Sequence, residues 1–519
     1  MRILILCWLL PAVVCGQVAS GSLKPTHVFG EAGGFYAPNQ RTPFWLQANQ
    51  SGIIPALMPF GTFRVGLRHD DRHHRMVMDT SGVPSRKRSF FCLAYGLEAA
   101  LNVGKTQQVL IPEAYLKAKV GPFEVWGGRR REVIGLADST MGLGPYAWSG
   151  NALPIPKIQI GLPDFTPLPM TGGLLAVQGF FAHGWFDNGF VKNSYLHQKA
   201  LYGRFGKPHW PVQLYAGLNH QVQWGGAVRE SLPTGYVRGG RFPSGLNDYV
   251  DVITGKSLGT RLEVDTSKYS PFDRENRLGN HLGTVDLGLE IRGREYSLLL
   301  YRQSIYEDGS LYYLTNIADG LNGIRFTNRR RLRSVISLQR LLVEFLYTRS
   351  QGGSVFADSP ARLRGRDNYF NHGQYRDGWS YQGRTIGTPF ITPWYTTRSD
   401  LPTHWFTNNN RVMVFHTALQ LLVQSRYSLF LKCSVSENQG IYDIPFTPPA
   451  WQFSSLLALQ LPVTRTGWQV NLSAAIDRGR LYTDQFGVYA GLRKSWVQPK
   501  KNTSPSAYRN IHGFPVRQQ

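Results

Sequence analysis

Long segments of this chain alternate between apolar and polar residues, and this period of two limits the fold more than any other feature. From Phe91 to Val103 one face carries phenylalanine, leucine, tyrosine, alanine and valine, while the other carries cysteine, alanine, glycine, glutamate and asparagine. Successive side chains of a β-strand point to opposite faces, so each such segment predicts a strand with one apolar side. The same alternation runs through 285–292, 427–436, 468–477 and 486–496.

Two architectures alternate in this way, a soluble β-sandwich and a membrane β-barrel. Segment length favours the barrel, because soluble strands usually span about 5–6 residues and tilted membrane strands about 9–11. Composition agrees: 55 Gly, 28 Phe, 25 Tyr and 13 Trp suit tight turns and interfacial aromatic girdles. Charges, Gly or Pro interrupt every apolar stretch after the amino terminus, so no helix of the required ~18 apolar residues is expected.

We therefore predict an all-β fold, a transmembrane antiparallel β-barrel of about 18 strands with long extracellular loops, allowing ~10 residues per strand and about 14 per connection. The barrel is expected over residues 56–497, after an amino-terminal periplasmic or plug segment at 17–55. The alternating segment that ends at Trp496 resembles the closing strand of outer-membrane barrels. A basic tail at 498–519 is expected to be loosely ordered on the periplasmic side.

The amino terminus predicts export. Arg2 precedes a short apolar run from Ile3 to Val14, which is typical of a signal peptide, and we place it at residues 1–16 with cleavage before Gln17. Lipidation of Cys15 stays an alternative. Together with the barrel, this predicts a multi-pass protein of the bacterial outer membrane.

The formal net charge is +24, and arginine clusters at 129–131, 329–333 and 362–366 contribute to it. A hydrogen-bonded lumen or loop face explains such clusters without a ligand. The alternative is attraction to anionic partners such as lipopolysaccharide phosphates or an acidic glycan. Nucleic acid is not expected, because the chain is exported and carries no recognisable nucleic-acid module.

Two long irregular stretches, 228–279 and 352–410, are predicted to be extracellular loops. The second contains RGRDNYFNHGQYRDGWSYQGRTIGTPF (364–390), which mixes amide, carboxylate and guanidinium groups with aromatic rings. Sugars bind such mixtures, since their hydroxyls need paired donors and acceptors and their C–H faces stack on rings. The candidate glycan contacts are Asp367, Asn368, Tyr369, Asn371, His372, Tyr375, Trp379, Tyr381 and Arg384. The alternative is a folded loop that plugs the barrel mouth and uses these side chains to satisfy its own backbone.

A second cluster, GLNHQVQWGG (217–226), adds His220 and Trp224 as candidates for the same pocket, or as residues that close a strand end. The crowded histidines and aspartates at 69–74 lack the fixed spacing of a metal site, so no metal and no cofactor are expected. Nucleophile elbow, HExxH and Walker motifs are absent, and no catalytic residue is predicted. Acidic pairs such as Asp367 with Asp377 leave a glycosidase as a minor alternative.

Several motifs resemble the capsule assembly protein Wzi family, in the branch found in Bacteroidetes-type bacteria. They occur in order along nearly the whole mature chain: TPFWLQANQSG (42–52), GRRREVIG (128–135), SGNALPIP (149–156), YLHQK (195–199), GLNHQVQWGG (217–226), LGNHLG (278–283), NIADGLNG (316–323) and RGRDNYFNHGQYRDGWSYQGR (364–384). The resemblance implies an outer-membrane barrel of about eighteen strands, with loops that occlude its mouth and a lectin-like role in attaching capsular polysaccharide.

The sequence thus predicts an outer-membrane protein that binds capsular or exopolysaccharide and retains or assembles it at the surface, without enzymatic activity. A channel or export conduit for glycan or solute is the alternative, and a glycoside hydrolase is a third. The expected partners are surface polysaccharide, outer-membrane lipid and lipopolysaccharide, and a monomer is favoured.

Overall fold

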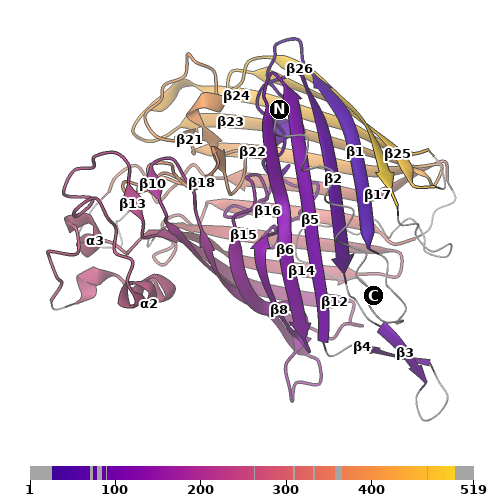
Figure 1. Cartoon of the computed structure of the whole chain (residues 1–519), viewed down its shortest axis with the longest axis horizontal. Helices are drawn as coiled ribbons and strands as arrows, with labels where there is room; N and C mark the ends of the chain where they lie inside the picture. The colour runs from indigo at the N-terminus through magenta and orange to yellow at the C-terminus, as the bar shows by residue number, and fades with distance from the viewer. Residues whose placement is uncertain are drawn as a thin grey trace, which may run out of the picture.

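Eighteen long strands form one closed antiparallel sheet, as the alternation predicted (Figure 1). Each strand pairs with the next wall strand along the chain, and β1 pairs with both β2 and β26, which closes the barrel. The wall strands are β1 (His27–Tyr36), β2 (Phe60–Asp70), β5 (Phe91–Gly104), β6 (Gln108–Val120), β7 (Phe123–Arg129), β8 (Lys157–Pro167), β9 (Leu175–Trp185), β11 (Tyr195–Phe205), β12 (Val212–Trp224), β14 (Asn280–Arg292), β15 (Tyr296–Glu307), β16 (Gly320–Asn328), β17 (Ile336–Tyr347), β22 (Val412–Val423), β23 (Tyr427–Gly440), β24 (Pro445–Pro462), β25 (Trp468–Gly479) and β26 (Gln485–Ser495).

The computed structural model describes residues 26–496, except 71–73, 79–83, 89–90, 262, 308–309, 331–333, 357–364 and 464–465. The predicted signal peptide (1–16) and basic tail (498–519) lie outside the described residues, as do part of the histidine-rich segment 69–74 and most of the arginine clusters 329–333 and 362–366.

The longest connections lie at one end of the barrel, and most connections at the other end are short, with 71–90 between β2 and β5 as the exception. At the turn end, β6 joins β7 through 121–122 and β22 joins β23 through 424–426. Gly121 has a φ of 57° there, a left-handed conformation that glycine adopts without strain. At the loop end, 225–279 joins β12 to β14 and 348–411 joins β17 to β22. Barrels of this type have short periplasmic turns and long extracellular loops, so the loop end faces outward from the cell.

The two faces of the wall differ as the alternation predicted. On β5, Leu93, Leu97 and Leu101 are 48%, 42% and 41% exposed on the outside, whereas Glu98 and Asn102 are 2% and 0% exposed in the lumen. The apolar outside therefore forms the membrane-facing band, and the polar residues are enclosed. None of the helices in the described ranges has the length and apolarity needed to span a membrane.

The amino-terminal boundary needs a correction. Residues 17–55 were expected to precede the barrel, but His27–Tyr36 is the wall strand β1, paired over its length with β2 and β26. This strand was missed because its sequence, HVFGEAGGFY, carries three glycines and its apolar residues stand partly in adjacent pairs, so its alternation is weak. It becomes a strand because the first and last strands of the barrel each need a partner for their open edge.

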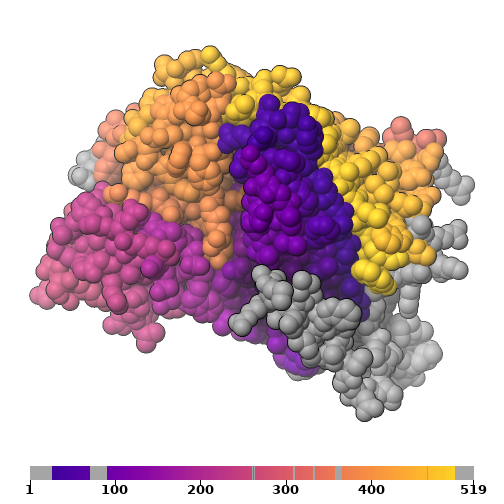
Figure 2. Space-filling view, turned by 45° about the horizontal axis from the view of Figure 1, so that its top comes forward, coloured from indigo at the N-terminus to yellow at the C-terminus, as the bar shows by residue number. Residues whose placement is uncertain are grey.

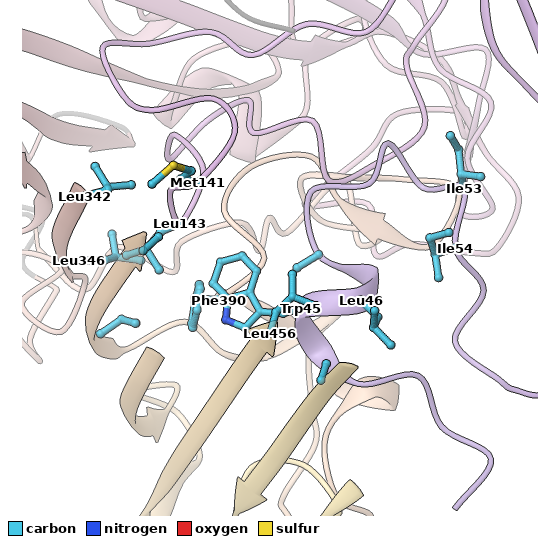
Figure 3. Close-up of a cluster of buried hydrophobic side chains, with 14 of the residues drawn as sticks. Trp45, Leu46, Ile53, Ile54, Met141, Leu143, Leu342, Leu346, Phe390 and Leu456 are labelled. Atoms are coloured by element: carbon cyan, nitrogen blue, oxygen red, sulfur yellow. The ribbon is translucent and has the colours of Figure 1, made fainter. Parts of the chain in front are cut away.

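Three loop segments fold over and into the lumen, and we call them the plug: residues 37–59, 130–156 and 365–411. They contain α1 (Phe44–Gln47), β18 (Ser380–Tyr381), β19 (Arg384–Thr385), β20 (Thr392–Pro393), η3 (Trp394–Thr396) and β21 (Thr407–Asn409). Figure 3 shows Trp45 of α1 beside Phe390, with Met141 and Leu143 next to Leu342 and Leu346 of β17. The apolar core of the molecule therefore lies inside the barrel, between plug and wall.

The remaining elements lie outside the plug. The loop 225–279 carries β13 (Ala227–Val228), α2 (Leu246–Thr254), η1 (Leu258–Thr260) and α3 (Pro271–Glu275), and β13 pairs with β10 (Val191–Lys192). At the other end, β3 (His74–Met78) and β4 (Pro84–Arg88) form a hairpin between β2 and β5. Figure 1 shows this hairpin at the opposite end of the molecule from α2 and α3.

Candidate functional site

The predicted glycan loop is folded into the barrel instead of standing free. Trp379 is fully buried, its Nε1 donates to Ala147 O at 2.8 Å, and its ring meets Trp148 edge-on at 6.3 Å. Tyr369 is also fully buried; its hydroxyl donates to Asp319 Oδ2 at 2.7 Å and accepts from Asn316 Nδ2 at 3.0 Å. The hydrogen-bonding groups of Trp379 and Tyr369 therefore have partners inside the protein, as expected for a loop that plugs the mouth.

The other candidates of this loop also have partners within the chain. Asn371 exchanges two hydrogen bonds of 3.0 Å with the backbone of Thr407, which ties the two arms of the loop together. His372 is half-buried, packs edge-on against Phe272 at 5.4 Å, and accepts from Gln374 N at 3.2 Å. The remaining contacts are Ser310 Oγ to Asp367 Oδ1 at 2.7 Å, Asn410 Nδ2 to Asn368 Oδ1 at 2.6 Å, Tyr375 OH to Gly225 O at 3.2 Å, Arg129 Nη2 to Tyr381 OH at 3.1 Å, and Arg384 Nη2 to Ile54 O.

The electrostatics of this loop follow from its burial. Loss of water lowers the pKa of His372 to about 4, so its imidazole is neutral at neutral pH and its Nδ1 is free to accept hydrogen bonds. Burial also lowers the pKa of Arg384 to about 10. Both groups have lost part of their contact with water, which favours a structural contact over exchange with ligands.

His220 and Trp224 lie near the loop end of β12, where Tyr375 of the plug donates to Gly225 O at 3.2 Å. Both have the outward phase of β12, and the ring nitrogens of His220 and His281 lie 2.9 Å apart. Trp224 stacks on Tyr249 of α2 with ring centres 5.0 Å apart. These two residues therefore lie at a strand end on the outer face of the wall.

Buried ion pairs attach the plug to the wall. Arg131 Nη2 lies 2.6 Å from Glu98 Oε1 of β5. Asp138 is 2% exposed and lies 3.4 Å from Arg325 Nη1 and 3.8 Å from Arg340 Nη1. The arginine cluster 129–131 is thus used internally, and lumen carboxylates compensate part of the net charge.

Polar contacts between plug and wall extend around much of the barrel circumference. They involve β14, β15, β17, β22, β23 and β25: Leu136 N to Asp286 Oδ2 (2.8 Å), Tyr146 OH to Glu307 Oε1 (2.5 Å), Leu143 N to Glu344 Oε2 (2.6 Å), His416 Nε2 to Met141 O (2.8 Å), Trp45 Nε1 to Ser434 Oγ (3.1 Å) and Phe44 N to Asp477 Oδ2 (2.8 Å). A plug with partners on so many strands crosses the lumen from side to side.

The loop end also carries an exposed group of aromatic and charged side chains. Arg366 Nη2 lies 2.5 Å from Asp443 Oδ1, and these side chains are 44% and 37% exposed. Trp405 Nε1 donates to Asp443 Oδ2 at 3.3 Å. A carboxylate, a guanidinium and an indole thus meet where water and solutes can reach them, which the buried loop residues do not offer.

The same group continues across the ends of β17, β22 and β23. The guanidinium of Arg411 lies 3.8 Å from the ring centre of Tyr442, and the Tyr442 hydroxyl donates to Ser350 O at 2.9 Å. Arg349 Nη1 lies 3.2 Å from Glu437 Oε1. We call this group the mouth cluster; it consists of Arg349, Arg366, Trp405, Arg411, Glu437, Tyr442 and Asp443.

Sequence reasoning missed the mouth cluster. Its members come from four separate parts of the chain, and only Arg366 stands in the dense motif 364–390 that contains the buried loop residues. The one available signal was the long loop 352–410, which contains Arg366 and Trp405. Pairing of β17 with β22 and of β22 with β23 brings the ends of these strands together, and only then do these residues become neighbours.

Two other kinds of site can be assessed. Among the residues that the structure describes, no group of three or more His, Cys, Asp or Glu side chains is placed to hold a metal ion. A depression of about 910 Å³ runs across strands from β9 to β17 and is lined by exposed outward side chains that include Leu214, Leu287 and Ile324. Its lining is mostly apolar and belongs to the membrane-facing band, and its polar residues Arg302 and Asn322 are hydrogen-bonded to each other at 2.9 Å.

Comparison with known proteins places these features in context. The family model described as capsule assembly protein Wzi matches residues 60–421. Among solved structures, Wzi of Escherichia coli, an outer-membrane protein involved in group 1 capsule assembly and described as a carbohydrate-binding β-barrel, aligns with a TM-score of 0.56 at 12% identity over 89% of this chain and 83% of that one.

Two further barrels align less well. OccAB4 of Acinetobacter baumannii gives a TM-score of 0.42 at 8% identity over 91% of this chain and 98% of that one. An anion-selective porin from Comamonas acidovorans gives 0.36 at 10% identity over 91% and 99%. No curated protein matches the chain.

Proposed function

This chain belongs to the capsule assembly protein Wzi family and is an outer-membrane β-barrel, and we propose that its mouth cluster binds capsular or extracellular polysaccharide and retains it at the cell surface. The observation that carries the proposal is that Arg366 and Trp405 both contact the carboxylate of Asp443 at the loop end, where these groups are accessible to solvent. The Wzi structure from Escherichia coli, described as carbohydrate binding, supports the same class of ligand.

The chemistry of the mouth cluster suits a sugar chain. The partly exposed indole of Trp405 can stack on the C–H side of a pyranose, and guanidinium and carboxylate groups can bind its hydroxyls. The cluster contains three arginines against two carboxylates, so it favours a glycan that carries negative charge.

The proposed role is binding without covalent chemistry. Asp443 and Glu437 each pair with an arginine, at 2.5 and 3.2 Å. Asp367 and Asp377, the acidic pair of the glycosidase alternative, have structural partners. Asp367 accepts from Ser310, and Asp377 Oδ2 accepts from Phe190 N at 2.6 Å. A glycosidase would need two carboxylates that flank a bond of the bound sugar.

A conduit for glycan or solute is less well supported. The plug is attached to strands on many sides of the lumen by ion pairs and hydrogen bonds. Conductance of the purified protein in planar bilayers separates the two functions, since a steady open channel would favour transport and silence would favour a plugged binding protein.

The first experiment measures retention of capsular polysaccharide by purified protein. We expect Trp405→Ala to weaken it, while Trp210→Ala leaves it unchanged. Trp210 is a suitable control because it is 38% exposed and lies in the turn between β11 and β12, at the opposite end of the barrel. Equal binding by the wild type and Trp405→Ala would exclude this cluster as the glycan contact.

The second experiment follows capsule on cells. Deletion of the gene should release polysaccharide into the medium without stopping its synthesis. Complementation with wild type should restore surface retention, and complementation with Trp405→Ala should restore it only in part. Unchanged surface retention after deletion would contradict the proposal.

A further inference from the structure

The helix α2 lies on the outer face of the barrel wall, although it belongs to a loop. Its residue Tyr249 stacks on Trp224 of β12, and Val252 joins Val222 and Trp224 in one buried cluster. Val222 and Trp224 have the same phase on β12 as Leu214 and Leu218, which are 47% and 44% exposed in the membrane-facing band. Near the loop end, α2 therefore covers the same face of β12 that lipid covers further along the strand.

A hydrogen bond from the wall fixes the height of the helix. The Lys199 side chain, on the outward face of β11, donates to the backbone oxygen of Ile253 in the last turn of α2. Leu201, two residues along the same face, is 57% exposed. Two residues of a strand span about 7 Å, so the last turn of α2 lies at the upper edge of the apolar band.

Several side chains of α2 are arranged in the reverse of what a helix beside water shows, although Val252 is buried. Asp248 and Asp251 are 0% and 4% exposed, whereas Leu246 and Val250 are 86% and 57% exposed. Leu246, Val250 and the half-buried Ile253 are spaced i, i+4 and i+7 and so share one face.

The inward carboxylates are compensated within the loop. Asp248 Oδ1 lies 2.7 Å from Lys268 Nζ and accepts from the Tyr269 hydroxyl at 2.7 Å. Asp251 Oδ2 lies 2.5 Å from Arg261 Nη2. A water-exposed helix would normally leave its charged residues outside and its leucine and valine inside, because that order buries apolar surface and keeps charges hydrated.

We infer that α2 is a membrane-surface element whose Leu246, Val250 and Ile253 face contacts the lipids of the outer leaflet. The argument for lipid is continuity: the exposed apolar face lies at the end of an apolar band that is itself covered by lipid. Aromatic residues that occur at membrane interfaces surround the docking point, with Trp185, Tyr195 and Trp224 beside His183.

The loop that carries α2 also contacts the plug, so a shift of α2 on binding lipid would be transmitted to the plug. Gln374 Nε2 donates to Asp273 Oδ1 of α3 and to Tyr236 O, both at 2.8 Å. Figure 2 shows the magenta surface of the α2–α3 loop adjoining the orange surface of the plug. The loop 225–279 thus connects the membrane surface to the mouth, and this holds whether or not the mouth binds glycan.

The experiment places an environment-sensitive fluorophore at single cysteines in a Cys92→Ser, Cys433→Ser background. The probe positions are Leu246→Cys and Val250→Cys, and both are exposed, so the label should not disturb folding. Leu218→Cys on the wall is the lipid control, and Gln382→Cys, exposed in the plug between β18 and β19, is the water control. Folding of each variant is checked by its heat-modifiable migration on gels.

Labelled proteins are reconstituted into phosphatidylcholine vesicles that contain a nitroxide-labelled phospholipid, or into vesicles with iodide on both sides. We expect labels at 246 and 250 to be quenched by the nitroxide lipid as at 218, and several-fold more than at 382. A label at Asn247→Cys, about 100° around the helix, should be quenched less by lipid than its neighbour at 246.

Two outcomes would overturn the inference. Quenching of 246 and 250 by iodide to the same extent as 382 would mean that the face is in water. Protection of both labels from lipid and from iodide would mean that a protein surface, such as a second copy of the chain, covers it.

Discussion

The buried part of the plug loop and the mouth cluster contain the same kinds of side chain and differ in where these lie. Trp379 is fully buried and donates to a backbone oxygen, whereas Trp405 is partly exposed and donates to an exposed carboxylate. Tyr369 is enclosed by Asn316 and Asp319, whereas Tyr442 has Arg411 over its ring near the surface. A mixture of aromatic, amide and charged groups therefore does not identify a binding site by itself.

This difference predicts that mutations in the two regions change different properties, namely the free energy of unfolding for the buried part of the plug and glycan binding for the mouth cluster. Side chains inside the plug contribute to the free energy of unfolding, since they fill space and satisfy buried polar groups. Side chains of the mouth cluster contribute little to stability, because exposed ion pairs are worth about 0–1 kcal/mol. Their effect should appear in glycan binding.

The largest effect is expected for Trp379→Ala. Removal of a fully buried tryptophan should lower the free energy of unfolding by about 3–5 kcal/mol, because it leaves a cavity beside Trp148. Denaturant unfolding of the detergent-solubilised protein measures it. Trp405→Ala is the matched control and should change stability by less than about 0.5 kcal/mol. Equal stability losses in the two variants would remove the distinction between the regions.

Asn371→Ala should have the next largest effect, about 1–3 kcal/mol, because it leaves the backbone N–H and oxygen of Thr407 unsatisfied in a buried position. Glycan binding by the folded fraction should stay unchanged, as measured by capsule retention per folded molecule. Loss of binding at unchanged stability would instead return the glycan contact to the loop that the sequence first indicated.

Trp405→Ala and Arg366→Ala should each weaken glycan binding by about 0.5–1.5 kcal/mol, the range for one aromatic contact, or about twofold to tenfold in affinity. Binding titrations with purified capsular polysaccharide measure this. Arg398→Ala is a suitable control, since its guanidinium also pairs with an exposed carboxylate, Asp400, but outside the cluster. A similar loss of affinity in the control would indicate general attraction to positive charge.

The smallest effect concerns pH. The pKa of His372 falls from 6.5 in the unfolded chain to about 4 in the plug, so the unfolded state binds more protons between these values. Stability should therefore fall as the pH decreases from about 6.5 to 4, and by a modest amount because the ring is partly exposed. Unfolding midpoints at pH 7 and 5 test this, and His372→Gln should reduce the difference. A higher stability at pH 5 in the wild type alone would contradict the assigned sign.

Much of the wall could be predicted from the sequence. The alternation at 91–103, 285–292 and 468–477 predicted both the strands and the side of each residue, and the closed barrel of 18 strands confirms it. The strand β1 escaped because its glycines hide the period. For the residues of the loop 364–390, sequence alone left open whether they bind a glycan or one another.

The sequence by itself determined the period of two, and with it the architecture, because lipid outside and an enclosed interior impose opposite chemistry on neighbouring residues of every strand. Only the tertiary structure decided which loop residues are inside. Whether Trp379 or Trp405 is buried depends on the contacts of the plug with strands that are far away in the chain. Local composition does not predict those contacts. The reversed faces of α2 likewise became interpretable only when the helix was placed against the outer wall.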